Sequence, residues 1–276
     1  MRKIIILVLL SLTLVAKTDT PLEQRARNYA DEYYSSFQQL AQLSNPYNEI
    51  GKQLELKIGK LVGQELGSEG ITDLSSEIRI SNDIDPILGS NSVKSDVTIT
   101  NYVGHFVEYA ATKDFGLSYK VNSCKQLESP SIKGVESDDF VKVVVSKTFS
   151  YANKFVDVDE TMTISLRKNN VILISINNSY GTAQSAGDLL AQALDYYSKH
   201  QFKEALAMFE KQIELFGAPD AYWYAAIMYY KNQGCRGMGY FKRYEKFIEY
   251  VKIVAKNENS VYRYRAKFIL VREGIE

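Results

Sequence analysis

The stretch that decides the fold spans residues 140–176 and reads FVKVVVSKTFSYANKFVDVDETMTISLRKNNVILISI. Apolar and polar residues alternate along much of it, which is the period of a β-strand whose two faces meet different surroundings. Small and polar residues interrupt the alternation at 150–153 and again at 167–170, where hairpin turns are expected. The stretch therefore predicts three antiparallel strands, at 140–149, 155–166 and 171–176.

A fourth strand is expected just before this stretch. Leu117, Tyr119 and Val121 alternate with polar residues from Gly116 onward, and the polar segment 128–139 then leads into the next strand. Strands joined by short turns pair antiparallel. The four strands are therefore expected to form one connected meander.

The residues before the sheet follow the period of an α-helix instead. Pro21 stands at a favourable first-turn position, and apolar residues recur every three or four positions up to about residue 43. Two further helices are expected at about 48–63 and at 96–111. A short strand is expected between them, at 77–80.

The order of these elements predicts an α+β domain over residues 21–178. It resembles the nuclear-transport-factor-two-like superfamily, in which a curved antiparallel sheet wraps around helices to form a cone with an internal pocket. The resemblance implies a pocket in which enzymatic relatives usually set a histidine or a carboxylate. His105 and Glu160 are the candidates for such a catalytic residue. Each also has a structural interpretation: His105 and Glu108 suit a solvated i,i+3 pair, and Glu160 suits the wet end of a hairpin.

The second half of the chain is expected to be helical. Small and polar residues at 177–187 mark a domain boundary, and the apolar residues beyond it follow helical spacing. This part of the sequence resembles a tetratricopeptide repeat. Such a repeat has a small residue, an aromatic, a second small residue, a second aromatic and a helix-ending proline in turn, which here are Ala193, Tyr196, Ala205, Phe209 and Pro219. The resemblance implies an all-α helical-repeat domain over residues 187–276.

The helical domain contains its own candidate binding residues. Residues 221–230 are ten apolar residues in a row and include Tyr222, Trp223 and Tyr230. An exposed row of tyrosines on a concave helical surface would bind a peptide, whereas a buried row would fill the core between the helices. Both interpretations are compatible with the sequence.

The end of this helical stack is expected to need a cover. Three helical repeats are usually required for stability, and fewer are visible in the sequence. Either the first domain or a partner should therefore cover an end of the stack. A last helix is expected up to Val271, with Val261, Tyr264 and Phe268 on its inner face.

The chain begins with a pattern typical of an export signal. A basic start at Arg2 precedes an apolar run over 4–16, which is shorter than the ~20 apolar residues of a membrane-spanning helix. A signal peptide over residues 1–16, export to the periplasm or the extracellular space and no integral membrane span are expected, with a buried N-terminal element as the alternative. In an oxidising compartment Cys124 and Cys235 could form a disulfide or remain two buried thiols.

Composition and motifs exclude several classes of function. The 276 residues carry 33 Lys or Arg and 33 Asp or Glu, so no net charge favours nucleic acid. The basic stretch 236–276 mixes both signs at helical spacing, as a solvated helix face does, so a nucleic-acid partner is not expected. The sequence has no phosphate-binding glycine loop, Cys-x-x-Cys pair, His-Glu-x-x-His motif or Gly-x-Ser-x-Gly motif. Neither a metal nor a cofactor is expected.

These patterns predict an exported, non-enzymatic adaptor or scaffold that binds a protein or peptide through helical repeats. The alternative is a pocket protein of the cone-shaped fold, either a small-ligand carrier or an enzyme of hydrolase or isomerase type. An enclosed pocket that carries Glu160 or His105 would favour this alternative.

Overall fold

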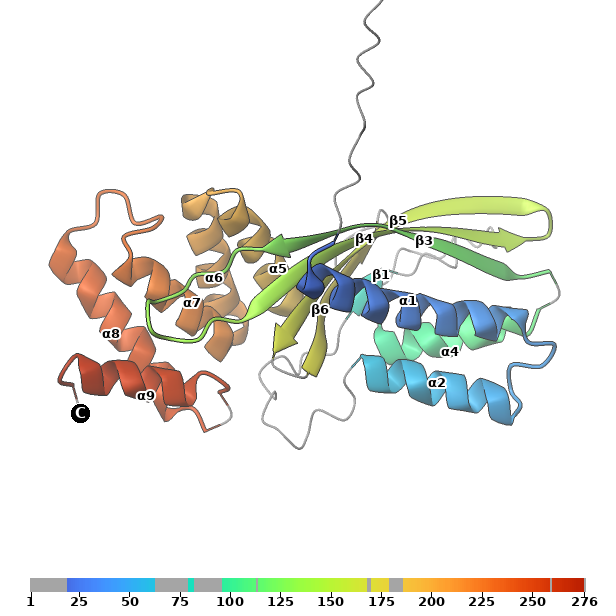
Figure 1. The fold of residues 1–276 in the computed structure, drawn as a ribbon, viewed down its shortest axis with the longest axis horizontal. Coiled ribbons are helices and arrows are strands. Elements are labelled where there is room, and N and C mark those ends of the chain that lie inside the picture. The colour runs from blue at the N-terminus through green and yellow to red at the C-terminus, as the bar shows by residue number, and fades with distance from the viewer. Residues whose placement is uncertain are drawn as a thin grey trace, which may run out of the picture.

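A computed structural model of the chain describes residues 19–62, 79–81, 96–112, 114–167, 170–178, 186–258 and 260–275. The expected signal peptide at 1–16 lies outside these ranges, as does most of the expected boundary segment. Figure 1 shows an α+β half and a helical half that follow one another along the long axis of the molecule.

Among the described residues, three helices belong to the α+β half: α1 (Pro21–Gln42), α2 (Glu49–Leu61) and α4 (Ile99–Ala110). A capping box starts α1, because the Thr20 side chain accepts a hydrogen bond from the Glu23 backbone and the Glu23 carboxylate accepts one from the Thr20 backbone. Pro21 occupies the first turn, as the sequence predicts.

The third helix begins later than its periodicity predicts. Two short strands pair antiparallel: β1 (Arg79–Ser81), close to the strand expected at 77–80, and β2 (Asp96–Thr98). The Thr98 side chain accepts a hydrogen bond from the Asn101 backbone and caps the helix there. The prediction of a helix from residue 96 is therefore wrong over its first turn, because pairing with a distant segment decides the structure there.

The four expected strands form the main sheet: β3 (Gly116–Leu127), β4 (Asp139–Tyr151), β5 (Lys154–Arg167) and β6 (Asn170–Asn178). They pair antiparallel in the order β3-β4-β5-β6, which confirms the predicted meander. The register shifts between Val121 and Ser123 and again between Thr163 and Ile164. Such bulges bend a sheet, and the long strands extend over α1 (Figure 1).

The inner face of the sheet packs on α1 and α4. Val141, Val143 and Val145 of β4 are 0% exposed, and they share one hydrophobic cluster with Phe37 of α1 and Phe106 of α4. Alternate residues of a strand reach the same face, so the period of two seen in the sequence places these valines in the core. Helices on one face of an antiparallel sheet form the expected α+β arrangement.

Five helices form the second half: α5 (Ala186–Ser198), α6 (Phe202–Phe216), α7 (Pro219–Tyr230), α8 (Tyr240–Lys256) and α9 (Arg263–Arg272). Each packs on the next one along the chain. Ala193, Ala205 and Phe209 are 0% exposed, as helices that approach closely require. Gly217 ends α6 in the left-handed region, with φ 59°, and Pro219 starts α7.

The last helix is rotated relative to the sequence expectation. Tyr264 is 78% exposed and Phe268 is 55% exposed, whereas Tyr262, Ala266 and Ile269 are buried. The expectation that Tyr264 and Phe268 face inward is therefore wrong. Tyr262 fixes the rotation, because it lies just before α9 and is anchored in the interior.

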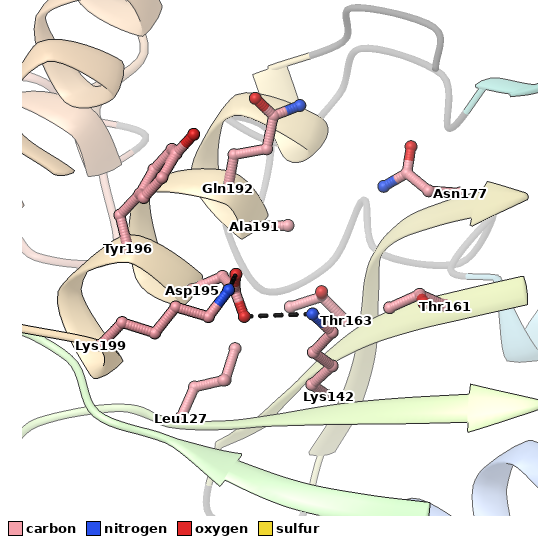
Figure 2. Close-up of a pocket in the computed structure, with 10 residues that line it drawn as sticks. All are labelled: Leu127, Lys142, Thr161, Thr163, Asn177, Ala191, Gln192, Asp195, Tyr196 and Lys199. Atoms are coloured by element: carbon pink, nitrogen blue, oxygen red, sulfur yellow. Dashed lines mark hydrogen bonds and ion pairs between the residues drawn. The ribbon is translucent and has the colours of Figure 1, made fainter. Parts of the chain in front are cut away.

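The outer face of the sheet packs against α5, the first helix of the stack. Ile174 of β6 and Leu194 of α5 belong to the same hydrophobic cluster. A Cβ atom on Gly187 would lie 2.1 Å from the carbonyl oxygen of Ile174, so the close approach requires glycine. Lys142 Nζ lies 3.1 Å from a carboxylate oxygen of Asp195 across this junction (Figure 2). The first half therefore covers one end of the stack.

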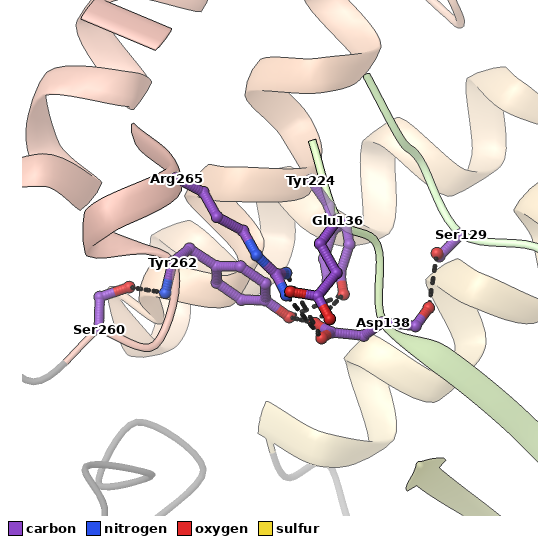
Figure 3. A network of polar contacts seen from close by, with 7 residues as sticks. All are labelled: Ser129, Glu136, Asp138, Tyr224, Ser260, Tyr262 and Arg265. Carbon is purple, nitrogen blue, oxygen red and sulfur yellow. Dashed lines mark hydrogen bonds and ion pairs between the residues drawn. The ribbon is translucent and has the colours of Figure 1, made fainter. Parts of the chain in front are cut away.

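A buried carboxylate joins the connection between β3 and β4 to the helices α7 and α9 (Figure 3). Asp138 is 4% exposed and accepts hydrogen bonds from the hydroxyls of Tyr224 and Tyr262. The guanidinium of Arg265 lies 3.4 Å from its other oxygen. Ser129 donates a hydrogen bond of 3.1 Å to the Asp138 carbonyl. One loop of the first half is thus held by two helices of the second.

Candidate functional site

The interior of the α+β half holds the candidate Glu160. Its side chain is 0% exposed, and one carboxylate oxygen lies 2.5 Å from Nζ of Lys147, whose side chain is 3% exposed. The Tyr34 hydroxyl donates a hydrogen bond to the other oxygen. Glu160 shares the inner face of β5 with the buried residues Val158 and Met162. The interpretation that Glu160 lies at the wet end of a hairpin is therefore wrong, because strand alternation turns it inward.

The cavity beside this ion pair is small. It measures about 10 Å³, which holds at most about one water molecule. Lys147 Nζ lies 5.4 Å from the centre of the Phe149 ring and 5.9 Å from that of Tyr102, so aromatic rings enclose the ammonium group. Burial, together with the charge of Glu160, raises the pKa of Tyr34 well above its usual value and keeps its hydroxyl protonated. A substrate has no room at Glu160.

His105, the other candidate, does not line this cavity. It is half-buried on α4, and Glu108 is exposed one turn away. The structure therefore does not bring His105 and Glu160 into a common site. Within the described ranges, no three His, Cys, Asp or Glu side chains come together in a group that could hold a metal ion.

The two cysteines are free, and both are buried. Burial raises the pKa of the Cys124 thiol to about 11 and moves that of Cys235 above its usual value. The thiolate is the reactive form of cysteine. Both thiols are therefore protonated and unreactive at neutral pH.

The candidate binding residues of α7 are divided between core and surface. Trp223 is 2% exposed and stacks on Tyr262, with ring centres 5.3 Å apart and planes 7° apart. Tyr222 is half-buried against Tyr250. Tyr230 is 44% exposed. Trp223 therefore fills the core between the helices, whereas the ring of Tyr230 is accessible at the surface.

The largest change from the sequence expectation concerns α9, whose outward side is apolar. Tyr264, Phe268 and Val271 are 78%, 55% and 77% exposed, and we refer to these three residues as the α9 stripe. Their spacing of four and three residues aligns them along one side of the helix. A helix normally turns such a row towards a packing partner. Here the opposite side of α9 packs on the stack and leaves the α9 stripe accessible.

Positive charge flanks the α9 stripe. At 3.6 residues per turn, Lys267 lies on one side of it and Arg272 on the other, and both are exposed. Lys267 makes no ion pair in the part of the chain that the structure describes, and Arg272 pairs with Glu273 at 3.2 Å. The stretch 236–276 has ten basic and five acidic residues. The rim of the stripe is therefore suited to negative groups.

Exposed aromatic rings continue at the start of α8. The Tyr244 hydroxyl donates a hydrogen bond of 3.1 Å to Glu273, which brings the start of α8 next to the end of α9. Tyr240 stacks on Tyr244 and is 63% exposed, and Phe241 is 81% exposed. The end of the stack opposite to α5 thus carries several accessible apolar side chains.

Comparisons of the chain with protein-family models, with curated proteins and with solved structures give no match in any of the three. Among the described residues, no helix has the length and apolar character needed to span a membrane.

Proposed function

We propose that the protein is a non-enzymatic binding protein whose C-terminal helices act as a helical-repeat stack and dock a protein partner on α9. The observation that carries the proposal is the α9 stripe, Tyr264, Phe268 and Val271, which is apolar, aligned and exposed. Exposed apolar rows rimmed by polar residues are typical of protein-binding sites. The small volume of the cavity at Glu160, about 10 Å³, argues against the alternative of a pocket enzyme.

The occupant that fits the α9 stripe best is an amphipathic helix with acidic residues beside its apolar face. Apolar residues at i, i+4 and i+7 match the face that a partner helix presents. Acidic flanks would meet Lys267 and Arg272. A second copy of this chain fits less well, because a two-fold contact through the stripe would bring the same cations face to face.

The position of α9 in the stack supports this occupant. The sheet packs on α5 at the other end, and each inner helix has a helix on either side of it in the chain order. A partner helix on the α9 stripe would pack as α9 itself packs on α8. It would thereby complete the cover that a short helical stack needs.

The export signal predicted at residues 1–16 places this interaction outside the cytoplasm, in the periplasm or the extracellular space. This location also remains a proposal. N-terminal sequencing of the mature protein tests it, with a first residue between Lys17 and Thr20 as the expected result.

Two designed peptides test the docking proposal. Both are amphipathic helices with the same leucine face; one has glutamates and the other lysines beside that face. We expect the acidic peptide to bind at least about ten times more tightly by fluorescence anisotropy, and the difference to shrink at high salt. Replacing the α9 stripe by serines should abolish this binding. Leu56→Ser, at a residue of α2 that is 66% exposed, is the control and should bind normally.

A photo-crosslinking residue at position 268 extends the test to the native partner. The control carries the same group at Phe155, which is 74% exposed near the tip of the β4–β5 hairpin. We expect a heterologous adduct from position 268 and none from position 155. A self-adduct of the chain, or equal binding of both peptides, would contradict the proposed partner.

A further inference from the structure

The connection between β3 and β4 is longer than the two strands require. Leu127 ends β3, Asp139 starts β4, and Leu127 pairs with Phe140, so the strands are in contact where the connection leaves them. Hairpin loops usually have about two to five residues, whereas this connection, 128–138, has eleven. We refer to residues 128–138 as the strap. The strap uses its excess length to reach the helical half of the molecule (Figure 1).

The strap contacts α5, α7 and the start of α9, which are alternate helices of the stack. At its start, the backbone N–H of Glu128 donates a hydrogen bond of 2.7 Å to Oγ of Ser198, the last residue of α5. At its end, the Asp138 carboxylate accepts hydrogen bonds from Tyr224 of α7 and from Tyr262, which directly precedes α9 (Figure 3). The strap therefore runs along a side of the stack that these three helices share. Helical-repeat stacks bind their partners along extended surfaces of this kind.

Two side chains anchor the strap on the helices. Ile132 is 6% exposed and belongs to the same hydrophobic cluster as the buried residues of the stack. Asp138 is 4% exposed, and the guanidinium of Arg265 lies 3.4 Å from one of its carboxylate oxygens. The same guanidinium lies 3.5 Å from the carboxylate of Glu136, which is exposed. Arg265 and two tyrosine hydroxyls thus form a carboxylate-binding site, with an apolar contact six positions earlier in the bound segment.

Between its two anchors the strap is largely exposed. It forms a turn in which the Val135 backbone N–H donates a hydrogen bond of 3.0 Å to the Ile132 carbonyl oxygen, and it belongs to no helix or strand. Lys133 and Ser137 are exposed. An open hollow of about 510 Å³ lies beside the strap and is lined by Lys231 at the end of α7. Protein interiors are close-packed, so the strap rests on the stack through its anchors and is not a close-packed element of it.

We propose that the side of the stack shared by α5, α7 and α9 is a peptide-binding surface, which the strap occupies as an internal ligand. The partner that fits it is an extended segment with the anchors of the strap, an apolar residue followed six positions later by an aspartate. Such a segment would displace the strap, whose two ends stay in the sheet. A segment without the carboxylate would leave the guanidinium of Arg265, whose side chain is 18% exposed, without its partner. This surface differs from the α9 stripe, because Arg265 faces the strap whereas Tyr264 and Phe268 face solvent.

A fluorescent peptide with the sequence of residues 128–139 tests the proposal on two variants of the full chain. In the first variant, Asn-Gly replaces residues 129–138 and forms a tight hairpin turn, which removes the strap. In the second, the strap stays but loses both anchors through Ile132→Ser and Asp138→Asn. Fluorescence anisotropy measures the affinity of the peptide for each. We expect both variants to bind it at least about ten times more tightly than the unmodified chain, because there the tethered strap competes at a high effective concentration.

Changes in the peptide and in the stack locate this binding. A peptide that carries Asp138→Asn or Ile132→Ser should bind the strap-free variant at least about tenfold more weakly, whereas Ser137→Ala, at an exposed position, should change its affinity less than about twofold. Arg265→Met in the stack should weaken binding at least about tenfold, and Lys252→Met, at an exposed lysine of α8, should leave it unchanged. Replacing the α9 stripe by serines should also leave it unchanged, which separates this surface from the docking site proposed for a partner helix.

Four outcomes would overturn the proposal. Absence of binding to both variants up to about 1 mM peptide would show that the strap is not a ligand of the stack. Equal binding of a peptide with the same residues in scrambled order would reduce the contact to a general attraction between charges. Loss of binding in the serine variant of the α9 stripe would place the peptide on that stripe instead. Loss of the folded helices in both variants, measured by circular dichroism, would make the strap a part of the fold.

Discussion

Glu160 and Lys147 form an ion pair in the interior of the α+β half, where each charge depends on the other. Glu160→Gln keeps the shape of the side chain but removes the negative charge. Removing one partner of a buried ion pair typically costs about 3–5 kcal/mol, so we expect the free energy of unfolding in urea to fall by about this amount. The double variant Glu160→Leu with Lys147→Met should recover much of the loss, because it removes both buried charges.

Glu108→Gln is the control for this experiment, because Glu108 is an exposed carboxylate on α4. Its effect should stay within about 0.5 kcal/mol. If Glu160→Gln were as stable as the unmodified chain, the ion pair would not stabilise the fold. Glu160 would then again be a candidate functional residue.

Substitution of alanine for two glycines is expected to change the stability of the chain in opposite directions. Gly187→Ala would place a Cβ atom 2.1 Å from the Ile174 carbonyl oxygen and force α5 away from β6. We expect a loss of about 1–3 kcal/mol in the free energy of unfolding. Gly104→Ala on α4 meets no atom within 4 Å, so it should stabilise the chain by up to about 1 kcal/mol. Equal effects in thermal unfolding would mean that α5 does not approach β6 so closely.

At the scale of single residues, the sequence could identify Glu160 as a candidate but not its surroundings. The unusual position of a carboxylate among apolar strand residues was visible in the sequence. Its partners were not, because Tyr34 comes from α1 and nothing in a local pattern joins it to β5.

At the scale of secondary-structure elements, we predict how substitutions between helices α5 and α6 change the stability of the chain. Ala193 and Ala205 are 0% exposed where the two helices approach each other. Ala193→Leu and Ala205→Leu should each lower the free energy of unfolding by about 1–3 kcal/mol, because a larger residue forces the helices apart. Asp at either position should cost more, since it would bury an unpaired charge.

Lys203→Ala is the matched change on the exposed side of α6 and should stay within about 0.5 kcal/mol. Differential scanning calorimetry of the leucine variants and this control measures the difference. If all of them unfolded at the same temperature, the assignment of Ala193 and Ala205 to a close helix contact would be wrong.

Elements joined by short turns could be predicted from the sequence, and elements paired over a distance could not. The hairpin turn at 150–153 falls where polar residues break the alternation, and Ala152 and Asn153 adopt positive φ there, 46° and 65°. By contrast, β2 looked like the first turn of a helix, because its partner β1 lies on the far side of a long segment. Hydrophobic periodicity indicates which secondary structure a local segment prefers, but it does not indicate a pairing partner elsewhere in the sequence.

The two faces of α9 show the same limit of prediction from periodicity. Tyr264 and Phe268 form one apolar row, and Tyr262, Ala266 and Ile269 form another, so the sequence alone supports either rotation. The stacking of Tyr262 on Trp223 and its hydrogen bond to Asp138 select the second. The α9 stripe could therefore not be predicted, because a tertiary contact made before the helix begins turns it outward.

At the scale of the whole molecule, the two halves are expected to stay together when the chain is cut between them. A protease site inserted between Asn178 and Ala186 would sever the direct connection of β6 to α5. The cluster of Ile174 with Leu194 and the bonds of Asp138 to α7 and α9 cross the junction without this connection. We expect both fragments to elute together in gel filtration and to unfold in a single transition.

Asp138→Asn sharpens this test. Asparagine keeps the size but removes the charge that Arg265 faces, and an unsatisfied buried group costs about 1–3 kcal/mol. The cut variant with Asp138→Asn should separate at a lower urea concentration than the cut chain alone. Two fragments that part at once and remain folded would show that residues 21–178 and 187–276 are independent domains.

If the chain is exported, folding must bury its two thiols before they are oxidised. Cys124 is shielded once β3 pairs with β4, opposite Val143, and Cys235 once the α7–α8 connection packs on the stack. Before that, each thiol titrates near its free value of about 8.5 and is open to oxidation. An early Cys124–Cys235 bridge would trap a chain whose folded form leaves them apart. Folding and oxidation therefore compete, and the native state is reached by chains that bury both sulfur atoms first.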